Sequence, residues 1–129
     1  MIITDTFSNF FSKIKNGYLI KKYKITQNKS KQIIKILNIF LKEGLIRSYN
    51  FCNKNKKIIN IYLKYKNKKS IIIQIIRISK PSKRIYIKNK ELFNKKKKGF
   101  YIISTSFGII TDLEAKKLNL GGELICNIY

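Results

Sequence analysis

The sequence predicts an α+β fold of two modules: an N-terminal two-helix, three-stranded unit and a C-terminal, mostly antiparallel β unit with a short helix. Apolar residues first recur at the helical period, and from Leu45 onward they alternate with polar residues as in half-buried strands. The one proline, Pro81, breaks an apolar run, because proline cannot donate a backbone hydrogen bond. We therefore expect one module over residues 1–79 and a second over residues 80–129.

Two amphipathic helices are expected in the N-terminal module. The first begins near Asp5 and ends before Gly17, and the second begins after Ser30 and stops at Gly44. A short strand is expected within residues 18–24. The apolar faces consist of Phe7, Phe10, Phe11 and Ile14 in the first helix and Ile33, Ile34, Leu37, Phe40 and Leu41 in the second.

The strands follow in order. A polar turn at residues 53–57 precedes a strand at 59–65, which implies a hairpin, and the apolar run 71–78 favours a strand covered on both sides. The second module is expected to begin with a strand at 84–87, to cross a basic loop at 95–98 and to return as a strand at 100–104. Thr111 and Glu114 fit a capping box for a helix ending near Leu118, and residues 123–128 form the closing strand.

The charge of the chain indicates a polyanionic partner. Its 129 residues hold 29 Lys and Arg against 6 Asp and Glu, a net charge of +23. Nucleic acid is the first candidate and an anionic membrane surface the second. Lysine, isoleucine and asparagine are abundant whereas arginine occurs three times, which is typical of an AT-rich genome, so part of the lysine content reflects drift on a solvated surface.

The composition argues against catalysis. The chain has no histidine, no paired carboxylates suited to acid–base chemistry, and two cysteines, Cys52 and Cys126, too widely spaced for a metal-binding unit. We expect buried, reduced thiols, no cofactor, no metal and no enzymatic activity. No signal peptide and no membrane-spanning helix are expected.

Two C-terminal segments combine hydroxyls, glycines and one carboxylate, at residues 104–108 and 120–126. Hydroxyls can bind ribose, phosphate and base edges, and glycines let a backbone approach closely. A carboxylate on such a surface is tolerated when it accepts a hydrogen bond, which suits folded RNA. The alternatives are a turn whose hydroxyls satisfy local backbone groups and, for Gly121–Gly122, a helix C-cap.

Three blocks in order resemble the bacterial-type family of ribosomal protein eight of the small subunit. The clearest block is residues 103–126, from ISTSFG to GGELIC. Ser30-Lys31 before a helix ending LKEGLI, and RISKP followed by RIY at 84–86, agree with it. The resemblance runs from about Asp5 to the last residue. Two positions depart from the family pattern: Phe107 replaces a basic residue and Ser82 replaces a glycine.

The resemblance implies a structural protein that binds the central domain of small-subunit rRNA, supports its assembly and contacts neighbouring ribosomal proteins, with no membrane and no small-molecule substrate. A free basic module that compacts nucleic acid or binds anionic membranes is the alternative. Tyr86 either stacks on a base or fills the core, and the loop at 95–98 either contacts RNA or is solvated. The residues expected at the rRNA are Ser30, Lys31, Arg77, Lys83, Arg84, Tyr86, Ser104, Thr105, Ser106, Gly108, Gly121, Gly122 and Glu123.

The composition also bears on the compartment. An AT-biased chain with bacterial-type motifs is expected on the ribosome of an organelle, with a plastid of the apicoplast type favoured over a mitochondrion. The alternative is the cytoplasm of an AT-rich bacterium.

Overall fold

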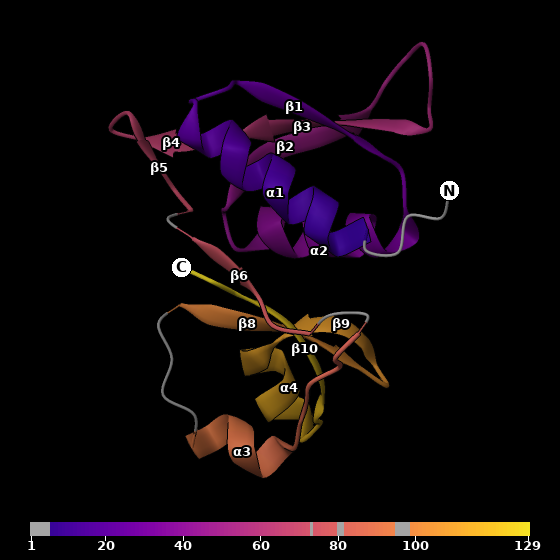
Figure 1. Cartoon of the computed structure of the whole chain (residues 1–129), viewed down its shortest axis with the longest axis vertical. Helices are drawn as coiled ribbons and strands as arrows, with labels where there is room; N and C mark the ends of the chain where they lie inside the picture. Colours follow the sequence, from indigo (N-terminus) through magenta and orange to yellow (C-terminus); the bar gives the residue numbers. More distant parts are fainter. Residues whose placement is uncertain (1–5, 73, 80–81, 95–98) are drawn as a thin grey trace. The chain divides into compact units, whose positions relative to one another are not determined.

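The computed structural model describes residues 6–72, 74–79, 82–94 and 99–129, and the chain divides into two compact units (Figure 1). The N-terminal unit is Thr6–Ile73, and Gln74–Tyr129 belongs to the C-terminal unit. This division falls earlier in the chain than the expected boundary between residues 79 and 80. Strand β6 (Ile75–Arg77) pairs with β10 (Gly122–Ile128), so the segment before Pro81 belongs to the second sheet.

The two expected helices form, as α1 (Thr6–Leu19) and α2 (Lys31–Lys42). Gly17 does not end α1 as expected but lies inside it. A Cβ at Gly17 would lie 2.9 Å from side-chain carbons of both Ile25 and Leu63, so glycine allows the helix to approach the sheet closely. Gly44, with φ +73°, follows α2 in the left-handed region, as predicted.

The N-terminal sheet has the order β1-β3-β2 and is antiparallel throughout. Its strands are β1 (Lys24–Asn28), β2 (Ile46–Phe51) and β3 (Ile58–Leu63), and β4 (Tyr65–Lys66) pairs with β5 (Lys69–Ser70) in a separate small hairpin. The β2–β3 hairpin was predicted, whereas the strand expected within residues 18–24 begins only at Lys24. The residues buried on one face of the sheet are Ile25, Gln27, Ile59, Ile61 and Leu63.

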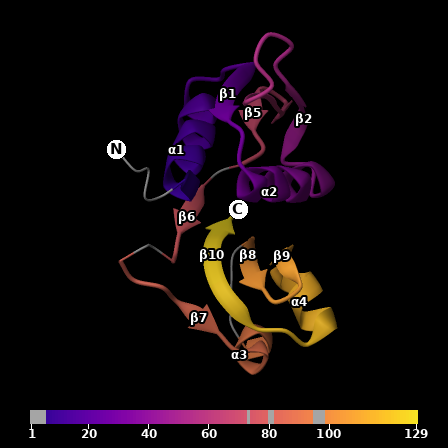
Figure 2. The same cartoon turned by 90° about the vertical axis from the view of Figure 1, so that its right-hand side faces the viewer.

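The C-terminal sheet has the order β6-β10-β8-β9, and β7 (Tyr86–Ile87) also pairs with β10 (Figure 2). Strands β8 (Phe100–Thr105) and β10 confirm the predicted strands, and β9 (Gly108–Thr111) adds an unpredicted one. A bulge between Leu124 and Cys126 shifts the register of β10 against β8. The core beneath this sheet contains Ile87, Tyr101, Ile103, Ile110, Ala115 and Leu124.

Two short helices complete the C-terminal unit. Helix α4 (Asp112–Leu118) begins as predicted, because the Thr111 Oγ1 accepts a hydrogen bond from the Glu114 backbone N–H at 3.4 Å. Helix α3 (Asn89–Asn94) was not predicted. The basic loop at 95–98 lies outside the described residues. Within the part of the chain that the structure describes, no helix is long and apolar enough to cross a bilayer.

Candidate nucleic-acid interface

One row of side chains crosses the C-terminal sheet on the face opposite its core. Glu123 of β10 lies in register between Tyr86 of β7 and Ser104 of β8. Residues in register on neighbouring strands point to the same face, and their chain neighbours point to the other. The next row, which includes Leu124 and Ile103, faces the core. Three residues predicted at an RNA surface are therefore side by side on one face.

The Glu123 carboxylate accepts hydrogen bonds from two side chains of the protein. The Ser79 hydroxyl donates to its Oε2 at 2.5 Å, and Arg84 Nη1 donates to Oε2 at 3.0 Å and to Oε1 at 3.3 Å. Burial alone would raise the pKa of Glu123. The hydrogen bonds from Ser79 and Arg84, with the charges of Arg84 and Arg77, outweigh burial and lower the pKa below its usual value. The carboxylate is therefore ionised and orients the Arg84 guanidinium, whose side chain stays 53% exposed.

Ser79 is the residue that sequence reasoning missed as a member of this site. It is 1% exposed, and its Oγ accepts from the Ile85 backbone N–H at 3.1 Å while donating to Glu123. Arg77 Nε donates to the Ser79 carbonyl. A hydroxyl directly after the apolar run 71–78 was a usable signal, because a polar group buried there needs partners.

The turn after β8 contains two hydroxyls in different situations. The Thr105 Oγ1 donates to the Gly108 carbonyl at 2.9 Å and accepts from the Phe107 N–H at 3.2 Å, so it closes the turn. Ser106 is exposed, and among the described residues its hydroxyl has no hydrogen-bond partner. Gly108 has φ +132°, which favours glycine. The turn thus presents Ser106 and the 69% exposed ring of Phe107 to solvent.

Gly121 and Gly122 allow backbone segments of the C-terminal sheet to approach one another closely. A Cβ at Gly122 would lie 2.1 Å from the Ser104 carbonyl oxygen, and one at Gly121 would lie 2.5 Å from the Ile87 carbonyl oxygen. Glycine at both positions therefore lets β10 run between β7 and β8. The alternative of a helix C-cap is wrong for this pair, because Asn119 takes that place with φ 56°.

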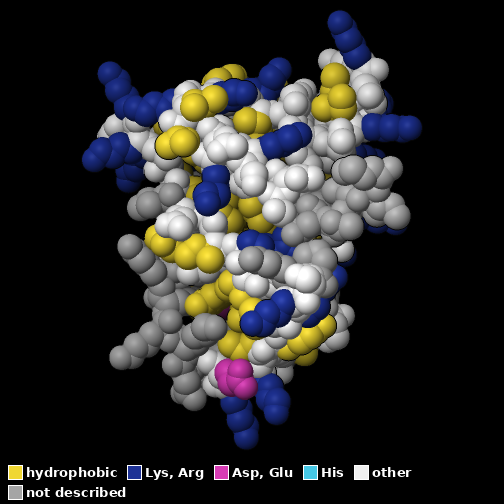
Figure 3. Space-filling view, viewed as in Figure 1, with side chains coloured by type: hydrophobic (Ala, Val, Ile, Leu, Met, Phe, Trp, Pro, Cys, Tyr) yellow, Lys and Arg dark blue, Asp and Glu magenta, His cyan; other side chains and the backbone are white. Residues whose placement is uncertain are grey.

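Ser30, Lys31 and Lys83 are predicted residues that do not belong to this row. Ser30 is the N-cap residue of α2 by backbone geometry, but its side chain makes no capping hydrogen bond, and Lys31 beside it is exposed. Both belong to the N-terminal unit. Lys83 is exposed, and Tyr86 is 69% exposed, so Tyr86 does not fill the core. Figure 3 shows Lys and Arg side chains spread over the visible face of both units.

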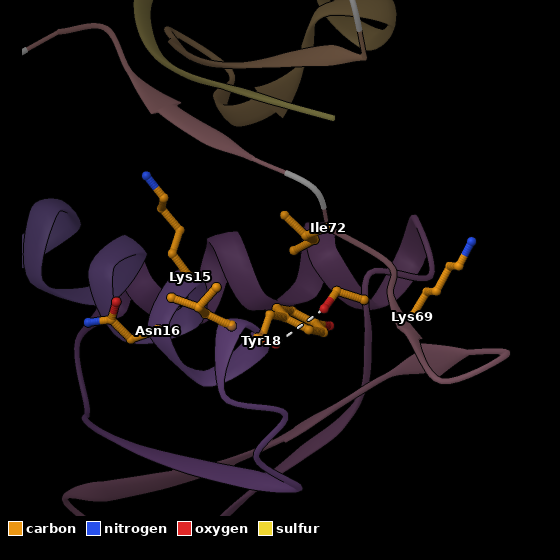
Figure 4. A pocket seen from close by; sticks show the side chains of 7 residues that line it. Lys15, Asn16, Tyr18, Lys69 and Ile72 are labelled. Atoms are coloured by element: carbon orange, nitrogen blue, oxygen red, sulfur yellow. Dashed lines mark hydrogen bonds between the residues drawn. The ribbon is translucent and has the colours of Figure 1, made fainter.

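One pocket lies in the N-terminal unit. It has a volume of about 470 Å³ and is lined by Lys15, Tyr18 and Ile72 among others (Figure 4). The Tyr18 hydroxyl donates to the Leu45 carbonyl at 2.5 Å, and burial raises the pKa of Tyr18 to about 12. None of the lining residues carries a carboxylate or a thiol. Across the described residues, no cluster of His, Cys, Asp or Glu could hold a metal ion.

Comparison with known proteins shows which family the chain belongs to. The family model described as ribosomal protein S8 matches residues 5–129. Proteins named small ribosomal subunit protein uS8 are 40% identical in Blochmanniella pennsylvanica and 39% identical in Buchnera aphidicola, each over 99% of both chains. The protein of that name in Syntrophomonas wolfei is 40% identical over the full length of both chains. The chain therefore belongs to the ribosomal protein S8 family and is a structural, non-enzymatic constituent of the small ribosomal subunit.

Proposed function

We propose that the chain binds the central domain of small-subunit rRNA through the C-terminal sheet and supports assembly of that domain. The contact surface, here called the Arg84 face, consists of Arg84, Tyr86, Ser104, Ser106, Phe107 and Glu123. The observation that supports it is the orientation of the exposed Arg84 guanidinium by the partly buried Glu123 carboxylate. A guanidinium held in one orientation can receive a phosphate with a defined geometry.

Each part of the Arg84 face has a separate role. Ser106 supplies a hydroxyl for ribose or phosphate, and the exposed ring of Tyr86 can stack on an unpaired base. Thr105, Gly121 and Gly122 shape the surface from within rather than touching RNA through their side chains. Glu123 acts as the internal partner of Arg84. Arg77 supports Ser79, while Ser30, Lys31 and Lys83 stay predictions for phosphate contacts.

The partners and the compartment follow from family membership and composition. Neighbouring small-subunit proteins are expected at the surfaces that RNA leaves free. The AT-biased composition predicts an organellar ribosome, with a plastid favoured over a mitochondrion. The relatives named above are bacterial proteins, and they favour the alternative of an AT-rich bacterium. Locating the reading frame on a bacterial or an organellar genome decides between these compartments.

The experiment compares a central-domain rRNA fragment with an unrelated RNA duplex of equal length. Arg84→Ala should weaken binding to the rRNA fragment about tenfold or more and binding to the unrelated duplex much less, because a charge-assisted hydrogen bond is worth roughly 1.5–3 kcal/mol. Lys117→Ala removes the same charge from the exposed surface of α4 and serves as the control. An unchanged ratio of the two affinities in Arg84→Ala would overturn the proposal.

The salt dependence gives a second measure. If roughly five phosphates are neutralised, the logarithm of the affinity should fall against the logarithm of salt with a slope of about −4.5. A free basic module would instead leave small subunits during a high-salt wash. Retention of the protein on washed small subunits therefore separates the proposed function from that alternative.

A further inference from the structure

The N-terminal sheet has one face that no described helix or strand of its unit covers. Burial alternates along β1 and β3: Ile25, Ile59 and Ile61 are buried, whereas the residues between them are exposed or half-buried. Pairing in register places Asn60 between Thr26 and Asn50 on the uncovered face. Antiparallel sheets often expose one face to water, so the chemistry of the side chains on it decides whether the face has a use.

An aromatic and cationic cluster stands at one end of this face. The rings of Tyr23 and Tyr62 meet edge to face, with centroids 5.6 Å apart and planes at 65°. The Arg47 guanidinium carbon lies 6.0 Å from the Tyr23 ring centroid. Lys24 and Ser48 flank Tyr62 in register on the two neighbouring strands. We call this cluster, with the amides of Asn50 and Asn60, the tyrosine platform.

The amides extend the platform along the sheet. Asn60 Nδ2 donates to Asn50 Oδ1 at 3.2 Å, which orients both side chains. Each amide has donor and acceptor capacity beyond this one bond. Amide groups beside aromatic rings can bind base edges while the rings bind base faces.

The positive charge around the tyrosine platform favours an anionic ligand. Glu43 is the single acidic residue of the sequence between Thr6 and Ile73, and it follows α2 rather than lying on the sheet. Tyr23 is 62% exposed, so a large ring surface is held in water beside Lys24 and Arg47. Rings for base faces, cations for phosphates and amides for base edges match an unpaired RNA strand. A duplex would present phosphates but would keep its base faces stacked inside.

We propose that the tyrosine platform binds an unpaired segment of RNA, as a second RNA site separate from the Arg84 face. The inference rests on the proposed rRNA binding and adds to it the class of RNA that the N-terminal unit takes. Bases stack on Tyr23 and Tyr62, and Arg47 and Lys24 contact the adjoining phosphates. Such binding tolerates many sequences, since every base has a face that can stack.

The test uses the full-length protein and a labelled, unstructured oligouridine of about ten nucleotides, with binding followed by fluorescence anisotropy. Tyr62→Leu and Tyr23→Leu should each weaken binding about fivefold to 150-fold, the range expected for one lost base–aromatic stack. Phe51→Leu is the matched control. Phe51 is 40% exposed, and Lys29 Nζ lies over its ring at 5.3 Å from the ring centroid. Phe51 pairs with Ile59, however, so it lies on the helix-facing side of the sheet.

The outcomes are distinct. The proposal is overturned if both platform variants bind oligouridine like the unmodified protein, or if Phe51→Leu loses as much. Thermal melting checks folding, and Tyr23→Leu decides the question if the half-buried Tyr62 position does not tolerate leucine. Platform variants that keep RNA binding but no longer join small subunits would identify the face as a protein-docking surface and would also overturn it.

The rRNA fragment separates this proposal from the proposed function. Platform variants should bind a fully paired central-domain helix within about twofold of the unmodified protein, because no unpaired base is present to stack. If the unmodified protein does not prefer that helix to an unrelated duplex, the role of the Arg84 face fails. The oligouridine measurements still decide the platform.

Discussion

The N-terminal sheet leaves one face to solvent, whereas the matching face of the C-terminal sheet is exposed only near Arg84 and is buried at Ile102 and Cys126, and the two surfaces hold their cations differently. On the C-terminal sheet a carboxylate, Glu123, holds the Arg84 guanidinium at 3.0 Å. On the N-terminal sheet the cations Lys24 and Arg47 lie beside tyrosine rings, and no carboxylate of the described residues orients them. A fixed guanidinium favours a partner of fixed shape, whereas exposed rings accept any base that can reach them. The first face suits a folded RNA helix and the second an unpaired strand.

The largest effect is expected from Gly122→Val, which tests whether the two units respond separately. The new side chain would meet the Ser104 carbonyl oxygen, a backbone atom that cannot rotate away. We expect a loss of about 3 kcal/mol in the stability of the C-terminal unit. Hydrogen exchange should show lost protection in β8 and β10 and retained protection in β1 and β3. Equal loss in both sheets would mean that the units unfold together.

Ser79→Ala should have the next largest effect, confined to the C-terminal sheet. It removes a buried hydroxyl that bonds Glu123 and the Ile85 N–H, which costs about 1–3 kcal/mol when partners are left unsatisfied. Urea unfolding measures the loss, with the exposed Ser82→Ala as control. The variant should also reduce preference for the rRNA fragment, since Arg84 loses its fixed partner. Equal stability of the two variants would argue against the buried network.

The pair Thr105→Val and Ser106→Ala separates folding from recognition within one turn. Thr105→Val removes two turn hydrogen bonds and should lower stability by roughly 0.5–1.5 kcal/mol per bond. Ser106→Ala should leave the melting temperature unchanged and weaken the rRNA complex about threefold to tenfold, by the same energy applied to binding. A lower melting temperature for Ser106→Ala with unchanged RNA affinity would assign its hydroxyl to the turn.

The smallest effect concerns pH. Because the pKa of Glu123 lies below its usual value of 4.5 in the folded protein, its contribution to stability is complete above that value and is lost as the pH falls through the lowered pKa. The difference in unfolding free energy between the unmodified protein and Glu123→Gln should therefore shrink as the pH falls below 4.5. Denaturant titrations across this range measure it. A constant difference would show that the carboxylate is not coupled to Arg84 and Ser79.

Local patterns predicted most of the elements, because helices and hairpins are stabilised by residues near one another in the sequence. The helix after Thr111 and the β2–β3 hairpin are of this kind. Contacts between distant residues were not predictable: Ser79 and Glu123 are 44 positions apart, and β6 joins the second sheet only because β10 returns beside it. The extension of α1 through Gly17 likewise depends on Ile25 and Leu63, which a helical pattern does not reveal.

At the candidate site, the sequence predicted which residues belong to the surface better than it predicted what each side chain does there. Tyr86, Glu123 and Ser104, each predicted at the rRNA, lie in register in one row. That Thr105 closes a turn while Ser106 faces solvent depends on side-chain orientation, which spacing does not determine. The role of Glu123 depends on Arg84, a partner 39 positions away.

The close approach at Gly122 also limits how this protein can evolve. Lysines on a solvated surface can be gained or lost singly, each at little cost, so a biased genome can change them freely. Every replacement at Gly122 introduces a Cβ against the Ser104 backbone, and it separates β10 from β8 at the point where Glu123 is positioned. No sequence of single tolerated steps changes that residue unless β8 first moves. The surface charge of this protein can therefore drift while the geometry of the Arg84 face stays fixed.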